Sequence, residues 1–416
     1  MEILSSVDER NTGSILQSNI GRETERPQQI KRNTAIFFLF VLVTTFFALF
    51  LIAVGSIGLI VSKVRSATIE TKKTKRDIAT HAALNQYLFT EMPGKDASGH
   101  VESISKRLEE LLNNLSFELD IKKNSYNNTR RHSLKRVMLK LTTEVTGETR
   151  FRLTLAFEYF DFVAEENKAM QDSRWWLRAK GCKNAGLMRN ESCLPFLERC
   201  LDDDNDDVRI EAAQSMLDIG GVQTLSPILM RLKDMSPWMQ VRLSKSIFGF
   251  GEHAVVHLVE AMRSPYPKVQ GFCVEILGML GDVKAVPTLL EYIEYAVPYV
   301  KHKSLIALGK IGDTRSIPII QKFLHSPDEQ LRIDASKAAG SLSSPLLAYD
   351  LHWMLVKDTM NVKLAAGEAL ARSGELGVKS LQYAINLEDE NVRMVALQFL
   401  HEAGVPVQAS QPQGER

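Results

Sequence analysis

Cysteine is scarce in this sequence, with four residues among 416. They are Cys182, Cys193, Cys200 and Cys273. The spacings of 11 and 7 residues between the first three fit no common zinc finger. We therefore expect reduced, structural thiols that hold no metal, and such thiols favour a reducing compartment.

Net charge is also nearly absent, because 51 basic residues oppose 50 acidic ones. A protein that grips nucleic acid usually carries an excess of positive charge on one face or one domain. The balanced composition therefore predicts no nucleic-acid partner.

Motifs of catalysis are missing as well. The sequence has no P-loop, no nucleophile elbow and no glycine-rich dinucleotide turn. The acidic run at 202–207 resembles a calcium loop, but it lacks the sixth-position glycine, and Ala213 replaces the twelfth-position glutamate. We predict a solvated loop with a helix-capping aspartate there. No cofactor and no small-molecule substrate are expected, so the chain is predicted not to be an enzyme.

Charged residues are wholly absent from residues 33–62. As a helix this run is about 45 Å long, against a hydrocarbon core of about 30 Å. It is longer than the apolar part of a signal peptide, follows a long polar tail and precedes no small-residue cleavage site. We predict a transmembrane helix at 33–62 behind a disordered tail at 1–32.

Basic residues are concentrated directly after the apolar run. They are Lys63, Arg65, Lys72, Lys73, Lys75 and Arg76. Basic residues beside a span favour the cytoplasmic side, so the remainder of the chain is predicted to be cytoplasmic. The same side chains are candidates for contact with anionic headgroups, at about 1 kcal/mol for each charge. The alternative is that they serve only as the topology signal.

A pair of residues, one aliphatic and one basic or amide, recurs every 28 to 33 residues between 177 and 393. Intervals of this size are typical of a solenoid. A second series, mostly of glycines, runs in step with the first and predicts helix ends: Gly220, Gly251, Gly281, Gly312, Ser343, Gly374 and Gly404.

Each copy of the repeat predicts a helix, a tight turn and a second helix. In one copy Val300, Ser304, Leu305, Leu308 and Ile311 share a helix face, Gly312 ends the helix and Pro318 begins the next. No single pair can bury its apolar stripe, so neighbouring pairs must stack. The predicted fold is all-α, with an α-solenoid of about eight pairs at 166–404 and a disordered tail at 405–416. Residues 63–165 are predicted to form a basic juxtamembrane segment and a helical neck that caps the array.

The helix pairs resemble the HEAT repeat, and more closely the short bacterial HEAT-like repeat of phycobilisome lyases. Residues 207–213 and 306–318 carry the resemblance. The order of apolar span, basic stretch, neck, residues 173–178 and array is similar to that of bacterial membrane-anchored HEAT-repeat proteins, some of which are associated with envelope glycosyltransferases. The resemblance implies an inner-membrane scaffold with its array in the cytoplasm.

A row of basic residues is predicted along the stack: Arg178, Arg209, Arg242, Lys301, Arg332, Lys363 and Arg393. We expect a structural ladder, in which each cation binds carbonyls or an acidic residue of the adjoining copy. Binding of an acidic partner is the alternative. Trp175 and Trp176 are predicted to pack against aromatic residues of the neck, with a contact to a partner as the other possibility.

The second helix of each pair is predicted to line the concave side of the stack, where an extended protein partner would bind. The candidate contact residues are Arg231, His257, Glu291, Tyr292, Lys322 and Gln382. A membrane-anchored scaffold without catalytic activity is the preferred hypothesis. The alternative is a HEAT-repeat enzyme or cofactor-handling protein of the lyase or hydroxylase type. Deoxyhypusine hydroxylases hold iron with several His-Glu pairs, whereas this sequence has one such pair, at 401–402.

Overall fold

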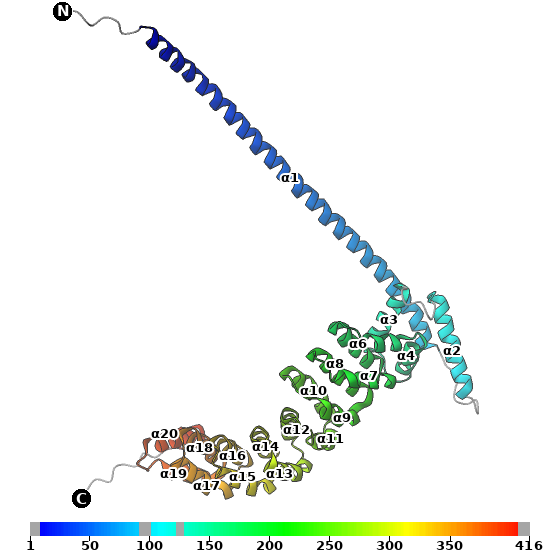
Figure 1. Cartoon of the computed structure of the whole chain (residues 1–416). Coiled ribbons are helices and arrows are strands. Elements are labelled where there is room, and N and C mark those ends of the chain that lie inside the picture. The colour runs from blue at the N-terminus through cyan, green and yellow to red at the C-terminus, as the bar shows by residue number, and fades with distance from the viewer. Residues whose placement is uncertain (1–8, 91–100, 122–128, 407–416) are drawn as a thin grey trace, which may run out of the picture. The chain divides into compact units, whose positions relative to one another are not determined.

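The computed structural model describes residues 9–90, 101–121 and 129–406. Within these ranges every regular element is a helix, and the helices stack into a solenoid, so the predicted fold class is confirmed (Figure 1). Residues 1–8 and 407–416, which belong to the two predicted disordered tails, lie outside the described residues.

The first helix, α1, covers Glu9–Phe89, which is 81 residues. By length and composition its segment Phe37–Phe89 is a candidate membrane span, and none of its most apolar stretch is buried in the protein. Residues 9–32, where we predicted disorder, are part of this helix. Extending an existing helix costs far less than nucleating one, so the polar segment continues the helix that the apolar run establishes.

The chain divides into two compact units, Met1–Ala82 and Ala83–Arg416. The second unit contains the last residues of α1, the neck and the repeat array. Its apolar core is continuous, from Leu84 and Leu88 through the neck to Leu400 in the last helix.

Four helices form the neck: α2 (Val101–Glu118), α3 (Thr129–Leu141), α4 (Gly147–Tyr159) and α5 (Phe162–Ala169). Phe157, Phe160 and Phe162 are fully buried there, and the ring centroid of Phe162 lies 6.4 Å from that of Phe157 and 5.9 Å from that of Phe160. The helices α4 and α5 form a pair like those of the array. The predicted boundary at 165/166 therefore falls inside a helix, because the neck ends in a repeat-like pair without the repeat sequence.

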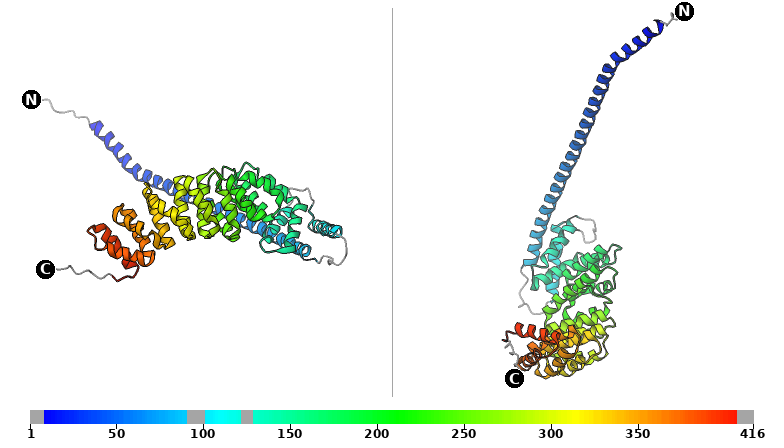
Figure 2. Two further views of the ribbon diagram at one scale, coloured as in Figure 1. Left: turned by 90° about the horizontal axis from the view of Figure 1, so that it is seen from below. Right: turned by 90° about the vertical axis from the view of Figure 1, so that its left-hand side faces the viewer.

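Seven helix pairs follow, and then one more helix, α20 (Glu390–Glu402). The first helices are α6 (Trp175–Met188), α8 (Asp206–Gly220), α10 (Pro237–Phe250), α12 (Pro267–Leu280), α14 (Pro298–Ile311), α16 (Glu329–Leu342) and α18 (Met360–Arg372). The second helices are α7 (Leu194–Cys200), α9 (Leu225–Arg231), α11 (His253–Ala261), α13 (Val286–Tyr295), α15 (Ile317–Leu324), α17 (Ala348–Lys357) and α19 (Gly374–Ala384). Figure 2 shows the same succession from two further sides.

Local sequence explains where the helices begin and end. Asn205, Ser236 and Asp328 cap first helices with side-chain oxygens that accept backbone N–H groups. Gly312 ends α14 in the left-handed conformation, with φ of 76°, as predicted. Ser343 fills the same place after α16 with φ of 50°. In five of the pairs a short 3-10 turn joins the first helix to the second: η1 (Glu191–Cys193), η2 (Gly221–Thr224), η3 (Val283–Ala285), η4 (Thr314–Ser316) and η5 (Pro345–Leu347).

Successive first helices approach closely at small residues. A Cβ atom built on Gly278 or Gly309 would lie 2.7 Å from the Cα of Ala307 or Ala338 in the next first helix, too close for any side chain. Gly340 makes the same contact with Ala369, at 2.9 Å. Backbones that approach this closely on one side bend the stack toward that side. In Figure 1 the first helices accordingly line the inner side of the arc and the second helices the outer side.

This curvature corrects a prediction. We expected the second helices, and with them Arg231, His257, Glu291, Tyr292, Lys322 and Gln382, on the concave side. They lie on the outer layer, because the small-residue contacts occur between first helices.

Candidate functional site

The ladder at the start of the first helices is built from side chains that bind the preceding loop and the following repeat. The guanidinium of Arg178 donates to the carbonyls of Asp172 and Ser173, both at 3.0 Å, and to the Asp203 carboxylate at 2.6 and 2.8 Å. Arg332 repeats this arrangement with Ser326, Pro327 and Asp358. These contacts match the structural interpretation of the row.

Lys363 and Arg209 complete the row in modified form. Lys363 is buried and donates to the Val356 carbonyl at 3.1 Å and to Asp389 of the next repeat at 3.0 Å. Arg209 donates to the carbonyls of Asp203 and Asp204, and its ion pair is with Asp206 of its own helix. Among the described residues, no hydrogen bond of this kind is found for Lys301 or Arg393.

Arg242 forms the predicted ion pair with an acidic residue of the adjoining copy, Glu211, at 3.2 Å, but it lies two residues beyond the ladder position, which corrects the predicted register of one repeat. Ser236 caps α10, so Met239, three residues later and fully buried, is equivalent to Val208 of α8. Gln240 then takes the ladder position and donates to the Met235 carbonyl, as Gln270 does to Ser264 in the next repeat. The misleading signal was the Val-Arg pair at 241–242. With Met239 in place, the repeat intervals on either side become 31 and 30 residues.

The acidic run at 202–207 serves helix capping and the ladder. The Asn205 side chain accepts the N–H of Asp207 at the start of α8, and Asp203 holds Arg178. The four cysteines are buried and free, and burial raises the pKa of Cys193 to about 11 and that of Cys273 to about 12. No group of three or more metal-ligating side chains occurs among the residues that the structure describes.

The six predicted partner contacts are not gathered in one place. Arg231 forms ion pairs with Asp202 and Glu198, and Lys322 forms one with Glu294 at 2.6 Å, so both take part in links between repeats. Glu291 and Tyr292 line a cleft of about 610 Å³ between α11 and α13. His257 is half-buried on α11, and Gln382 is exposed on α19.

A second cleft on the outer layer was missed by sequence reasoning. It has a volume of about 420 Å³ between α17 and α19, and Leu346, Tyr349, Leu376 and Tyr383 line it. All four side chains are more than half exposed, and Tyr349 is 80% exposed. Apolar residues at helical spacing normally predict core, so the exposure of these four side chains could not be predicted from the sequence.

His352 lies in the floor of this cleft, which we call the α17–α19 cleft. Its ring lies 5.7 Å from the Tyr383 ring, and its buried Nδ1 has no hydrogen-bond partner. Burial lowers the pKa of His352, so the imidazole is neutral at neutral pH. The cleft therefore presents an aromatic, largely uncharged surface.

The two adjacent tryptophans are also exposed. Trp175 and Trp176, in the first turn of α6, are 41% and 53% exposed and contact each other edge to face at 6.0 Å. Neither is buried against the neck aromatics, and a contact to a partner stays a prediction.

The basic residues after the apolar run all lie on α1, and Lys73 forms an ion pair with Glu70 at 3.3 Å. Three turns further on, α1 is fixed to the neck. The Arg152 guanidinium donates to the carbonyls of Leu88 and Thr90 at 3.1 and 2.7 Å, and the Tyr87 hydroxyl donates to the Arg152 carbonyl at 2.9 Å. These bonds satisfy carbonyls that the end of a helix leaves open.

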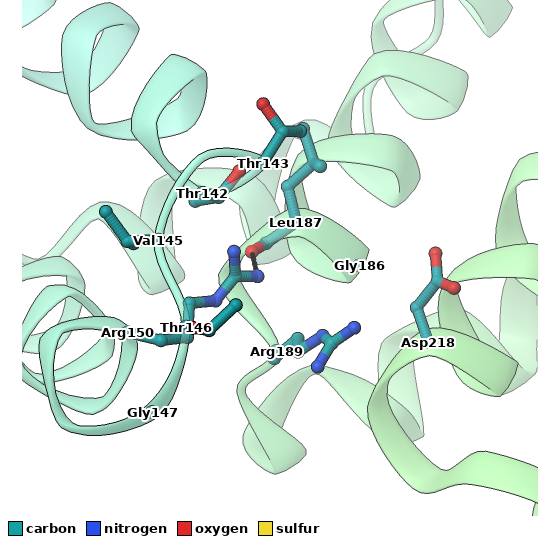
Figure 3. A pocket seen from close by; sticks show the side chains of 10 residues that line it. All are labelled: Thr142, Thr143, Val145, Thr146, Gly147, Arg150, Gly186, Leu187, Arg189 and Asp218. Carbon is teal, nitrogen blue, oxygen red and sulfur yellow. Dashed lines mark hydrogen bonds between the residues drawn. The ribbon is translucent and has the colours of Figure 1, made fainter.

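A third cleft, of about 450 Å³, lies where the loop before α4 meets the ends of α6 and α8 (Figure 3). Arg150, Arg189 and Asp218 are its charged residues, and three threonines, at 142, 143 and 146, also line it. Arg150 donates to the Leu187 carbonyl. None of the predicted site residues lies here.

Comparison with known proteins identifies the repeat. Residues 167–242 and 255–340 match the family model described as HEAT repeats. No curated protein matches the sequence. Solved structures with similar folds include an engineered protein (TM-score 0.36, 14% identity, 78% of this chain and 99% of that chain) and human deoxyhypusine hydroxylase (0.27, 16%, 72% and 98%).

A phycocyanin lyase complex of CpcE and CpcF from Nostoc sp. is a further similar structure (TM-score 0.23, 18% identity, 75% of this chain and 98% of that chain). Likenesses at these scores carry no conclusion about activity. The helix pairs and their spacing agree with the family match, so residues 167–242 and 255–340 are similar to HEAT repeats, and the remaining helix pairs of the stack repeat the same arrangement.

Proposed function

We propose that this chain is a membrane-anchored, non-enzymatic HEAT-repeat scaffold that binds a protein partner and holds it at the inner membrane, with the array in the cytoplasm. A solenoid of HEAT repeats is consistent with a protein-interaction scaffold. The long apolar helix α1 and the basic residues that follow it support the anchoring and the orientation. The similarity of layout makes envelope and glycosyltransferase assemblies the first class of partner to test.

The observation that carries the proposal is the exposure of aromatic and aliphatic side chains around the α17–α19 cleft. Leu346, Tyr349, Leu376 and Tyr383 surround it, and Trp353 on α17 is 48% exposed. Soluble proteins seldom leave large apolar side chains clustered in water, and such clusters mark interaction sites. Tyrosine and tryptophan are also the residues most often found at the energetic centre of an interface.

The membrane anchor adds to affinity without any further contact. A protein held at the bilayer meets other membrane proteins at a raised effective concentration. A modest interface at the α17–α19 cleft is therefore sufficient for recruitment of a membrane or membrane-proximal partner.

The experiment is crosslinking of the full chain in native membranes, followed by purification and identification of bound proteins. We expect the double variant Tyr349→Ala/Tyr383→Ala to lose most of the specific partner while keeping wild-type helicity. The matched control is Phe117→Ala, because Phe117 is a fully exposed aromatic on α2, away from this cleft. Equal capture by wild type and the double variant would remove the cleft from the proposal.

The outer-layer cleft between α11 and α13 gives a second comparison. Glu291→Lys and Tyr292→Ala test the residues that sequence reasoning selected there. Loss of the partner in these variants alone would move the binding surface to that cleft. The non-enzymatic part of the proposal is tested separately, since stoichiometric iron or zinc in the purified chain would favour the hydroxylase or lyase alternative.

A further inference from the structure

The cleft between the neck and the first two repeats holds two arginines whose charges are not neutralised by ion pairs. Within the described part of the chain, neither Arg150 nor Arg189 has a carboxylate within salt-bridge distance. One N–H group of Arg150 donates to the Leu187 carbonyl. Figure 3 shows the Arg150 and Arg189 side chains on the same side of the cleft. Most other arginines of the array are matched with an acidic residue, as Arg178 and Arg332 are.

The surroundings of Arg150 disfavour its positive charge. Partial burial, and then the charge of Arg189, lower the pKa of Arg150. Asp218, at the far side of the cleft, supplies the one negative side chain, and it hydrogen-bonds Gln214. Two cations against one anion leave an excess of positive charge that an anionic ligand would neutralise.

Hydrogen-bond donors of a second kind complete the cleft. Thr146 is the N-cap residue of α4, a 13-residue helix, and its side chain makes no capping hydrogen bond. The exposed Thr146 and the first residue of α4, Gly147, both line the cleft, so they are accessible to a ligand there. Helix N-termini favour negative charge, and phosphate is among the anions that they bind. A planar carboxylate is satisfied by one arginine, whereas a tetrahedral phosphate accepts from two arginines, a hydroxyl and backbone N–H groups together.

We propose that this cleft binds a phosphate group, with Arg150 and Arg189 as its cationic ligands and Thr146 with the α4 N-terminus as neutral donors. The phosphate belongs either to a small soluble molecule or to a lipid headgroup, and the chemistry of recognition is the same for both. This site goes beyond the proposed scaffold function and does not depend on it. The site is proposed for binding alone, which is compatible with the expectation that the chain has no small-molecule substrate.

The test is calorimetric titration of the full chain, held in neutral-lipid nanodiscs, with inorganic phosphate and with glycerol phosphate. A second arm measures binding to vesicles that contain phosphatidic acid, against vesicles of phosphatidylcholine alone. We expect Arg189→Asn to weaken phosphate binding by about tenfold or more, because a charge-assisted hydrogen bond contributes about 1.5–3 kcal/mol. Asparagine also tolerates the left-handed conformation of residue 189, where φ is 52°.

The matched control is Arg372→Asn, which removes an exposed arginine of the same layer that is paired with Glu368. Arg150→Gln provides a second variant, and its melting temperature shows whether loss of the Leu187 hydrogen bond has damaged the fold. Binding of soluble phosphates that both site variants weaken supports a free ligand. Binding of phosphatidic acid vesicles alone, again weakened by both, supports a lipid headgroup. Absence of binding in the wild type, or equal binding by wild type and Arg189→Asn, would overturn the proposal.

Discussion

At the scale of single residues, the array depends on helix contacts that are too close for a larger side chain. Gly278, Gly309 and Gly340 allow the backbones of successive first helices to touch. Arg178 on α6, Arg332 on α16 and Lys363 on α18 each bind a carbonyl of the segment before their helix and an aspartate of the next repeat. Small residues thus set the spacing between repeats, and charged residues link each repeat to its neighbour.

The glycine contacts predict a sharp difference between two substitutions. Gly278→Ala places a methyl group 2.7 Å from the Ala307 Cα, and because that neighbour is backbone, the helices must separate. Overpacking of this kind costs about 1–3 kcal/mol. Gly249→Ala is the control, since nothing lies within 4 Å of a Cβ atom there and α10 should gain up to about 1 kcal/mol. Urea unfolding followed by circular dichroism measures both, and equal midpoints would contradict the close contact.

The ladder predicts a dependence on pH. Burial acts to raise the pKa of Asp358, but hydrogen bonds from Arg332 and from the Thr359 N–H outweigh burial and hold the pKa below its usual value. The native pKa is thus lower than the unfolded value of about 3.9. The ion pair therefore stabilises the fold above about pH 4, and this contribution is lost as the pH falls through the native pKa.

Asp358→Asn should accordingly lower the melting temperature at pH 7 and reduce the difference in melting temperature between pH 7 and pH 3. Glu388→Gln is the control, because Glu388 is an exposed carboxylate without a recorded ion pair. Identical pH profiles for Asp358→Asn and wild type would show that the Arg332 bond contributes nothing to stability.

At the scale of helices, the pattern of the sequence explains most of the architecture. The glycine series predicted helix ends, and Gly281, Gly312 and Ser343 all adopt the left-handed conformation after first helices. The direction of curvature was predicted wrongly, because it depends on distances between helices of different repeats. The small residues that set those distances were visible in the sequence, but their partners were not. The exposed aromatic residues of α17 and α19 follow a core-like spacing, so only the three-dimensional arrangement separates them from the core.

The end of α1 predicts a local effect at the junction with the neck. Arg152→Ala removes both hydrogen bonds to the carbonyls of Leu88 and Thr90, and an unsatisfied buried carbonyl costs about 1–3 kcal/mol. We expect faster hydrogen exchange at residues 83–90, with little change in the repeats beyond α8. Arg107→Ala serves as the control, since Arg107 bonds Glu110 on its own helix. Unchanged exchange at residues 83–90 would show that apolar packing alone holds the helix end.

At the scale of the whole molecule, one continuous helix joins an apolar segment to a repeat array. Residues 83–89 of α1 belong to the same compact unit as the array, while the preceding residues form the other unit. The helix is thus both the candidate membrane span and the first element of the neck. If α1 spans a membrane as proposed, the array is joined to the span by the same helix, without a separate linker.

This arrangement predicts the outcome of a topology experiment. A fluorescent reporter fused after the last residue should be active in intact cells, and alkaline phosphatase at the same place should be inactive, because the basic residues after the span favour the cytoplasmic side. Replacing Lys72, Lys73, Lys75 and Arg76 by glutamine should reduce this bias, whereas Lys337→Gln should not. Phosphatase activity of the wild-type fusion would place the array outside the cytoplasm.

The first helices are not joined by close glycine contacts on either side of α10. Where α6, α12, α14 and α16 carry a glycine that approaches the next first helix closely, α8 carries Leu217 and α10 carries Phe248, and Trp238, Val241 and Phe248 are exposed on α10. Close backbone contacts of this kind therefore join the first helices from α12 to α18 but not those on either side of α10. We therefore expect bending of the array to occur mainly at α10, with the repeats before it and the repeats after it moving as two separate bodies.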